Sequence, residues 1–345
     1  MNRKSFFWIG PLALLSLVSF GAQPASAAQA TKTHKKTTAV YSRERSQTRK
    51  ATLAKARAVA MAREMADTVT PRYKADANGE LVPDLRAAAA IIYNPETNEV
   101  LWESNSQTQR SIASITKMMT ATVFLENNPD TSQVVTMVHS DVFQASTTHL
   151  RLNDKVTTDD LLHLMLIASD NAAARALARV SPYGSDGFIR RMNEKAGELG
   201  LENTHYADPS GLLSDNVSSA YDMARLITHV SGDDRITSIM RMPEYTVYTK
   251  NTRPHAITFH STDHLLGRPG IDVRAAKTGF ISKAGYCLAT LLRLPEAAGG
   301  QDVAVVVLGA RSNAGRFLET QNLFNWLSLR ASTILAPKPQ QQQQQ

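Results

Sequence analysis

A serine and a lysine three residues apart, Ser114 and Lys117, are the first pair in the sequence that could carry out chemistry. Apolar residues recur at helical spacing from there to Glu126, so both side chains are predicted to lie on one face of a helix. A serine hydroxyl becomes a nucleophile when a base takes its proton, and a lysine can be that base if its pKa is lowered. Taken singly the pair is a weak signal, because the same spacing occurs in helices with a solvated lysine.

Two further motifs, at residues 169–171 and 277–279, contain polar residues in unusual places. The Ser-Asp-Asn motif separates two predicted helices, where it could present side chains to a site or simply cap a helix. The Lys-Thr-Gly motif lies in a predicted strand, where glycine permits close approach of another backbone and the lysine and threonine suit a carboxylate ligand. Its alternative is an edge-strand lysine that deters aggregation.

The elements around these motifs predict one compact α/β body. Two strand-like runs, 87–93 and 99–103, flank a turn signal and predict a hairpin. Helices are predicted at 114–126, 158–168, 171–180 and 315–329, and later strands at 273–279, 285–292 and 303–309. No internal repeat is present, so the motifs must converge within a single fold.

The three motifs, in this order, resemble those of penicillin-binding proteins. With the segment Asp208–Leu212, they resemble the low-molecular-mass group of D-alanyl-D-alanine carboxypeptidases and endopeptidases, which are serine D,D-peptidases. The resemblance covers residues from about Ala87 to Leu329. It implies an α/β (α+β) fold of the β-lactamase/D,D-peptidase type, in which helices flank an antiparallel sheet and a helical subdomain bears Ser169.

The resemblance also implies a role for each motif residue. Ser114 would attack the carbonyl of the penultimate D-alanine, Lys117 would accept its proton, and Ser169 would relay that proton to the leaving amine. Six residues would bind the substrate: Asn171, Lys277, Thr278, Gly279, Phe280 and Arg316. Lys277 would also lower the pKa of Lys117, and the backbone amides of Ser114 and Phe280 would form an oxyanion hole. For Arg316 a surface position at a helix end is the alternative.

The implied substrates are peptidoglycan stem peptides, with β-lactams as their analogues. Carboxypeptidases of this group often add a β-rich domain and an amphipathic helix, whereas this chain stops soon after Trp326, closer to the single-domain endopeptidase type. A β-lactamase would need a glutamate that activates water, and no Glu-x-x-x-Asn element lies between Asn171 and Lys277. The other alternative is a non-catalytic sensor of the wall, which the three intact motifs disfavour.

No cofactor or metal is expected. The lone cysteine, Cys287, lies in an apolar stretch and is predicted to be a buried strand residue, so neither a disulfide nor a cysteine nucleophile is expected. The histidines His255, His260 and His264 lack the H-E-x-x-H helix pattern, so they do not indicate a metal site. The chemistry must therefore come from hydroxyls and amines.

The N-terminus predicts export. Residues 1–27 combine Arg3 and Lys4, an apolar run and the small residues Ala25-Ser26-Ala27, as in a signal peptide that is cleaved; an uncleaved anchor is the alternative. The predicted location is the periplasm or cell envelope. Residues 81–332 are expected to be the catalytic domain and 333–345 a tail rich in Pro and Gln.

Positive charge is concentrated in the predicted leader, residues 28–80, which is expected to be disordered or partly helical. Residues 28–65 contain ten Lys or Arg and two Glu, a net charge of +8, and the first 27 residues add +2. Because the whole chain carries +7, the residues after 65 carry a net charge of −3. This segment could attract an anionic wall polymer or membrane surface, or could be a solvated linker. Nucleic acid is not an expected partner.

Overall fold

The computed structural model describes residues 50, 52–60, 62 and 70–335. The predicted signal peptide, most of the leader and residues 336–345 of the predicted tail lie outside these described residues. The chain divides into two units, 1–60 and 61–345. In the first unit, residues 52–60 are helical with exposed side chains.

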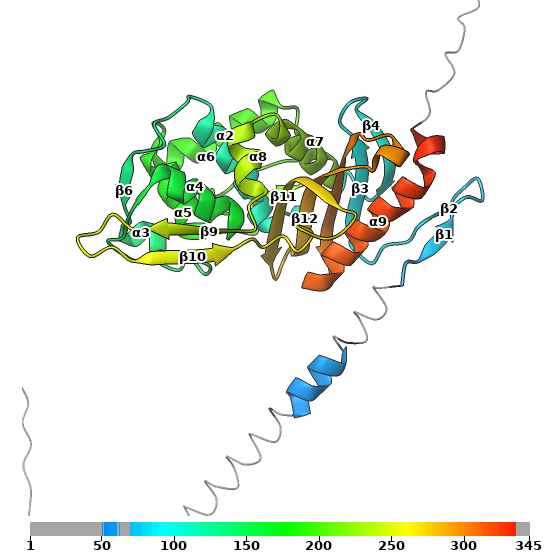
Figure 1. Cartoon of the computed structure of the whole chain (residues 1–345), viewed down its shortest axis with the longest axis horizontal. Helices are drawn as coiled ribbons and strands as arrows, with labels where there is room; N and C mark the ends of the chain where they lie inside the picture. The colour runs from blue at the N-terminus through cyan, green and yellow to red at the C-terminus, as the bar shows by residue number, and fades with distance from the viewer. Residues whose placement is uncertain (1–49, 51, 61, 63–69, 336–345) are drawn as a thin grey trace, which may run out of the picture. The chain divides into compact units, whose positions relative to one another are not determined.

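The second unit is built on a five-stranded antiparallel sheet with the order β11–β12–β13–β3–β4 (Figure 1). Its strands are β3 (Ala89–Asn94), β4 (Glu99–Ser104), β11 (Asp272–Ile281), β12 (Gly285–Arg293) and β13 (Asp302–Ala310). Every strand predicted from the sequence is therefore confirmed, including the hairpin formed by β3 and β4. The turn between them follows Asn94, whose side chain accepts a hydrogen bond from the backbone N–H of Glu96 at 2.9 Å.

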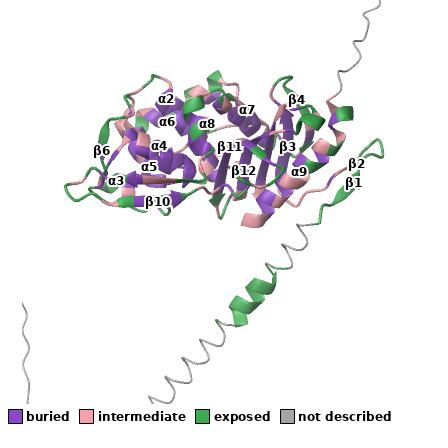
Figure 2. Ribbon diagram, viewed as in Figure 1, coloured by how far each residue is buried: buried purple, intermediate pink, exposed green. Residues whose placement is uncertain are grey.

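Both faces of the central strands β12, β13 and β3 are buried, whereas the edge strand β4 is largely exposed (Figure 2). In β13, Val303 and Val305 pack into one apolar cluster while Ala304 and Val306 pack into the other, as the two-residue period of a strand requires. Helix α9 (Asn313–Ile334) covers one face, and α7 (Ala220–Ser231) covers the other. A strand covered on both sides has no polar face, which explains the nearly continuous apolar run in its sequence.

A helical subdomain completes the body. Its helices are α2 (Lys117–Leu125), α3 (His139–Val142), α4 (Thr158–Ile167), α5 (Asn171–Val180), α6 (Gly184–Glu198) and α8 (Asp234–Met240). All residues of α2 are buried, so this helix runs through the interior. The side chain of Thr157 caps α4 and that of Asp170 caps α5. Helices α3, α6, α7 and α8 were not predicted from the sequence.

In the described part of the chain, four two-stranded sheets lie outside the main sheet. They are β1 (Tyr73–Ala75) with β2 (Leu81–Pro83), β5 (Arg110–Ser111) with β8 (Val217–Ser218), β6 (Val134–Thr136) with β7 (Lys155–Thr157), and β9 (Glu244–Tyr248) with β10 (Ala256–His260). The loop that joins β9 to β10 projects at the far end of the helical subdomain (Figure 1). Within the described ranges, none of the helices combines the length and apolar character needed to cross a membrane.

Candidate active site

Ser114 and Lys117 lie where a 3₁₀ turn, η1 (Ala113–Thr116), runs into α2. The Lys117 Nζ atom is 2.9 Å from the Ser114 Oγ atom, so the predicted contact between hydroxyl and amine is present. Ala113 adopts a left-handed backbone conformation with φ of 50°, which is costly for a residue with a side chain. The turn that presents Ser114 is therefore held in place by the surrounding structure.

Lys117 is fully buried and has three partners. Besides Ser114, its Nζ atom lies 2.6 Å from the side-chain oxygen of Asn171 and 2.6 Å from the backbone oxygen of Ser210. Those two oxygens can only accept, whereas the Ser114 hydroxyl can also donate. A neutral amine has two N–H donors and one lone pair. Its two donors can serve the oxygens of Asn171 and Ser210, and its lone pair can accept the hydroxyl proton of Ser114. The geometry suits a neutral lysine that receives the proton of Ser114.

Burial lowers the pKa of Lys117 to about 7, although the carboxylates of Asp208 and Asp170 oppose the shift. Burial likewise lowers the pKa of Lys277 well below its ordinary value, and the charge of Lys117 adds to the effect. The sequence interpretation assigned the lowered pKa of Lys117 to its neighbour Lys277. Removal from water is instead the main cause, because it penalises the charged amine directly.

The loop after Asp208 holds Lys117, a role that sequence reasoning missed. The Asp208 carboxylate accepts hydrogen bonds from the backbone of Ser210 (2.6 Å) and Leu213 (2.7 Å) and from the side chain of Asn216 (2.7 Å). Burial alone would raise the pKa of Asp208, but these bonds outweigh it and hold the pKa below its usual value. The loop thus fixes the Ser210 carbonyl that accepts from Lys117. Its sequence signal was the Asp-Pro-Ser-Gly-Leu segment itself.

The Ser169–Asn171 motif both caps a helix and faces the site. Asp170 is the cap of α5 and accepts a hydrogen bond from the Ala173 N–H at 3.0 Å. Ser169, in a left-handed conformation with φ of 60°, accepts from the Lys277 Nζ atom at 2.9 Å. Asn171 donates from its side chain to the Ala145 backbone oxygen at 2.7 Å, which orients its own oxygen toward Lys117. The two interpretations of this motif are therefore compatible.

Strand β11 brings the third motif against the nucleophile. A Cβ atom on Gly279 would lie 2.7 Å from the Ile112 backbone oxygen and 3.1 Å from the Ser114 nitrogen, so only glycine permits this approach. Lys277 is 1% exposed and is not a solvated edge lysine. The Thr278 hydroxyl lies 2.6 Å from that of Thr262, on the segment that follows β10.

Arg316 is buried, which excludes the surface position considered from the sequence. Its Nη1 atom donates to the backbone oxygens of Gly279 (3.0 Å) and Cys287 (3.2 Å), and burial lowers its pKa to about 10. The half-exposed Phe280 ring stacks on Tyr286 with centroids 4.2 Å apart. Cys287 is a buried free thiol in β12, as predicted, and burial raises its pKa to about 11.

These elements surround an open pocket of roughly 410 Å³. Seven of the nine predicted site residues line it: Ser114, Ser169, Asn171, Thr278, Gly279, Phe280 and Arg316. Lys117 and Lys277 lie behind the hydroxyls of Ser114 and Ser169. The other lining residues are Ser146, Thr147, Ala168, Gly211, Leu212, Thr262, Ile281 and Ser282. No carboxylate side chain is among them, so the pocket combines hydroxyls with nearby cations.

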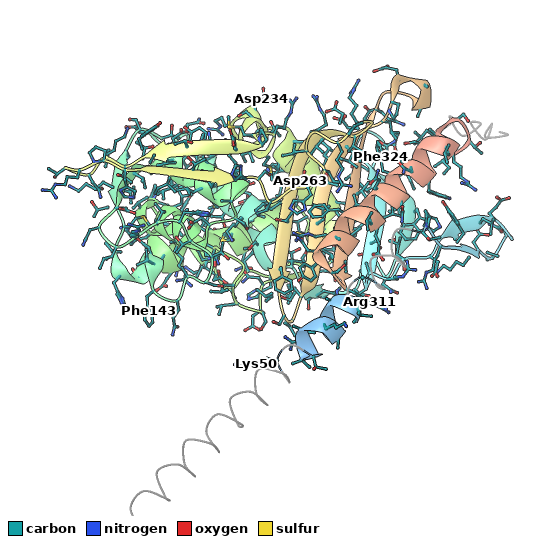
Figure 3. The ribbon with its side chains drawn as sticks, turned by 60° about the horizontal axis from the view of Figure 1, so that its bottom comes forward. Lys50, Phe143, Asp234, Asp263, Arg311 and Phe324 are labelled. Carbon is teal, nitrogen blue, oxygen red and sulfur yellow. The ribbon has the colours of Figure 1, made fainter. Side chains whose placement is uncertain are left out.

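Asp263 is a second residue that sequence reasoning missed. It lies where the chain passes from β10 to β11 (Figure 3). Burial raises its pKa, while the charges of Arg316, Arg268 and Lys277 oppose that shift. One carboxylate oxygen accepts from the Leu265 N–H at 3.0 Å, and the other is buried with no hydrogen-bond partner among the described residues.

The three histidines noted in the sequence each contact a different residue: His255 contacts Thr249, His260 contacts Glu244 and His264 contacts Phe317.

Comparison with known proteins places this fold and site in a class. Residues 76–312 match the family model described as D-alanyl-D-alanine carboxypeptidase, peptidase family S11. The chain is 32% identical over 72% of its length to the D-alanyl-D-alanine endopeptidase of Pseudomonas aeruginosa and 31% identical over 71% to that of Escherichia coli. These matches cover 79% and 78% of the two relatives.

Solved structures of D,D-peptidase-type proteins are similar in fold to this chain. The Streptomyces K15 DD-transpeptidase superposes with a TM-score of 0.65 at 29% identity, covering 71% of this chain and 97% of that one. Penicillin-binding protein D2 of Listeria monocytogenes, solved with bound cefotaxime, gives 0.60 at 30% identity and covers 70% and 97%. Fold and site thus define a serine hydrolase of the D,D-peptidase class. The chain belongs to the peptidase S11 family of D-alanyl-D-alanine carboxypeptidases, which confirms the resemblance and the predicted fold class.

Proposed function

We propose that Ser114 is the nucleophile of a serine D,D-peptidase that acts on peptidoglycan stem peptides. The observation that carries this proposal is the buried amine of Lys117, 2.9 Å from the Ser114 hydroxyl and hydrogen-bonded otherwise only to acceptors. With a pKa of about 7, a large fraction of Lys117 is neutral at neutral pH. It is then a competent general base.

In the first step Lys117 takes the proton as Ser114 attacks the carbonyl of the penultimate D-alanine. The negative charge that develops on that oxygen would be stabilised by the backbone amides of Ser114 and Phe280, which belong to the two segments that Gly279 allows to meet. The C–N bond breaks, and the leaving amine receives a proton through Ser169. The Ser169 hydroxyl is suited to this relay because Lys277 donates to it.

The acyl-enzyme is then hydrolysed by water, with the same groups acting in reverse. The substrate carboxylate would bind near Thr278, whose hydroxyl lines the pocket, with the Arg316 guanidinium supplying positive charge behind it and the Lys277 amine available as a hydrogen-bond donor. Asn171 lines the pocket beside Ser169 and would contact the substrate amide. These roles follow from position and chemistry, since the pocket walls contain cations and hydroxyls where the substrate carries a carboxylate.

We further propose a preference for endopeptidase over carboxypeptidase activity, supported by the two endopeptidases to which the chain is similar. An endopeptidase must admit a longer chain beyond the scissile bond than a carboxypeptidase. Digestion of crosslinked and uncrosslinked muropeptides side by side measures this preference. Faster release from the uncrosslinked pentapeptide would contradict it.

The proposed location is the cell envelope, where peptidoglycan lies. The predicted signal peptide at residues 1–27 supports export. In the proposed organisation, the basic leader at 28–80 precedes a catalytic domain at 81–332, and the tail follows at 333–345. Comparison of the N-terminal sequence of the protein recovered from the periplasm with the encoded one tests the cleavage after Ala27.

A fluorescent penicillin tests the nucleophile. The intact protein should form a covalent adduct, and Ser114→Ala should abolish it, because no other hydroxyl has the amine of Lys117 within hydrogen-bonding distance in the described residues. Ser282→Ala is the matched control, since Ser282 also lines the pocket and should keep the adduct. A wild-type protein without an adduct would refute the proposal.

The pocket is poorly suited to rapid β-lactam hydrolysis. No Asp or Glu is among the pocket-lining residues of the described structure, so the pocket wall offers no carboxylate to activate a water against the acyl-enzyme. The adduct should therefore persist long enough to be detected on a denaturing gel. The intact contacts of Lys117 also disfavour a non-catalytic sensor with a decayed site.

A further inference from the structure

The loop between β9 and β10 and the turn before β7 form one surface, here called the basic tip, comprising residues 151–155 and 248–255. Backbone and side-chain contacts join the two segments: the Lys250 N–H donates to the Lys155 oxygen at 2.7 Å, and the Lys155 N–H donates to the Asn251 side chain at 2.7 Å. These hydrogen bonds hold the two segments together, so the tip is one continuous surface and not two independent loops.

Positive charge dominates this tip. Four exposed cations, Arg151, Lys155, Lys250 and Arg253, have no ion-pair or hydrogen-bond partner for their side chains among the described residues. The only acid in the tip is Asp154, which is 3% exposed. Its carboxylate accepts from the Arg151 N–H and the Asn251 amide, so it is engaged inside the tip.

This concentration of charge contrasts with the rest of the body, since the chain after residue 65 carries a net charge of −3. Two large apolar side chains lie among the cations, Tyr248 at 64% exposed and Leu152 at 50%. An exposed aromatic ring can stack on the apolar face of a sugar, while unpaired Lys and Arg side chains attract carboxylates. Both features fit a polymer that contains sugars and acidic peptides.

The tip is connected to the pocket by a single strand. Thr262, which lines the pocket, is nine positions after Arg253, and β10 accounts for five of the eight residues between them. At about 3.3 Å per residue this is a separation of up to about 30 Å. A polymer long enough to span this distance can occupy the pocket and the tip at the same time.

We propose that the basic tip is a second binding site for the polymeric substrate, holding carboxylate-bearing peptidoglycan while one of its peptides occupies the pocket. The inference rests on the proposed function, which supplies the substrate class. Two contacts on one polymer raise its effective concentration at the pocket without any change in the chemistry there. A bilayer surface is the less favoured partner, because within the tip only Leu152 and Tyr248 are exposed large apolar side chains available for insertion.

The test uses the full chain carrying Lys155→Gln, Lys250→Gln and Arg253→Gln together. We expect co-sedimentation with isolated insoluble peptidoglycan to weaken about tenfold at low salt. Cleavage of a soluble crosslinked muropeptide dimer and acylation by fluorescent penicillin should stay unchanged. Raising the salt concentration should weaken the wild type more than the variant, because salt screens exposed charges.

The matched control neutralises three other cations, Lys74, Arg190 and Arg241, which are exposed and outside the tip. It should sediment like the wild type. Equal sedimentation of the tip variant and this control would overturn the inference, as would a tip variant that keeps peptidoglycan but loses binding to vesicles containing phosphatidylglycerol. Sedimentation is measured on a Ser114→Ala background as well, so a failure of the proposed chemistry leaves this result readable.

Discussion

At the scale of single residues, the site depends on one amine that is kept out of water. Lys117 gains no carboxylate partner in compensation for its burial; its partners are a hydroxyl, an amide oxygen and a carbonyl oxygen. Neutral acceptors stabilise an ammonium less than an ion pair does, so the neutral form becomes accessible near neutral pH. Burial therefore turns an ordinary cation into a base.

This predicts the pH dependence of acylation. The neutral fraction of Lys117 grows as pH rises through its pKa of about 7, so the acylation rate should rise about tenfold per pH unit below that value and level off above it. Penicillin acylation followed from pH 5 to pH 8 measures this limb. Lys117→Arg should not react at any of these pH values, because a guanidinium keeps its proton. A rate that is flat across the range contradicts lysine as the base.

At the scale of elements, the pocket exists because β11 can approach the turn η1. The two segments are more than 150 residues apart in the chain, and the absence of a side chain at Gly279 lets their backbones meet. At Gly211, a Cβ atom would overlap the backbone carbonyl of Ala113, so the loop after Asp208 meets η1 in the same way. Two glycines thus bring three elements around Ser114.

Gly279→Ala should separate these elements. A Cβ atom 2.7 Å from the Ile112 oxygen meets backbone, which cannot rotate away, so β11 must shift and the oxyanion-hole amides lose their alignment. We expect acylation to fall by about 10²–10³ and the free energy of unfolding by about 1–3 kcal/mol. Acylation kinetics and thermal unfolding of the purified variant measure both. Gly197→Ala is the comparison, because the Cβ position of Gly197 is surrounded by open space and its φ is not positive; acylation should be retained there.

Sequence alone predicts the parts of this architecture that depend on local pattern. The strands around 87–103 and 272–310 follow from apolar runs bounded by turn residues, and the contact of Ser114 with Lys117 follows from helical spacing. Helix α6 was missed because it begins with Gly184 and contains Gly187, which oppose helix formation. The roles of Asp208 and Asp263 depend on segments that meet only after folding, and no local period marks them.

At the scale of the whole molecule, charge is divided between parts. The leader carries +8 in residues 28–65, the chain after residue 65 is −3, and within that acidic body the basic tip keeps four unpaired cations. The two basic regions stand more than 80 residues apart in sequence. An anionic polymer can therefore be attracted by both while the acidic remainder limits non-specific adhesion.

Removal of residues 28–65 should test this division. The buried clusters of the body contain no residue before Val82, and the pocket is lined by residues between 114 and 316, so penicillin acylation should be unchanged. Removal of +8 takes the net charge of the whole chain from +7 to −1, and to −3 once residues 1–27 are cleaved. Its sedimentation with insoluble peptidoglycan at low salt should therefore fall, with the remaining binding due to the basic tip. Removal of the tail residues 336–345, which contain one lysine, is the control and should change neither measurement. Unchanged sedimentation of the leaderless chain would instead make the leader a solvated linker, and lost acylation would make it part of the catalytic body.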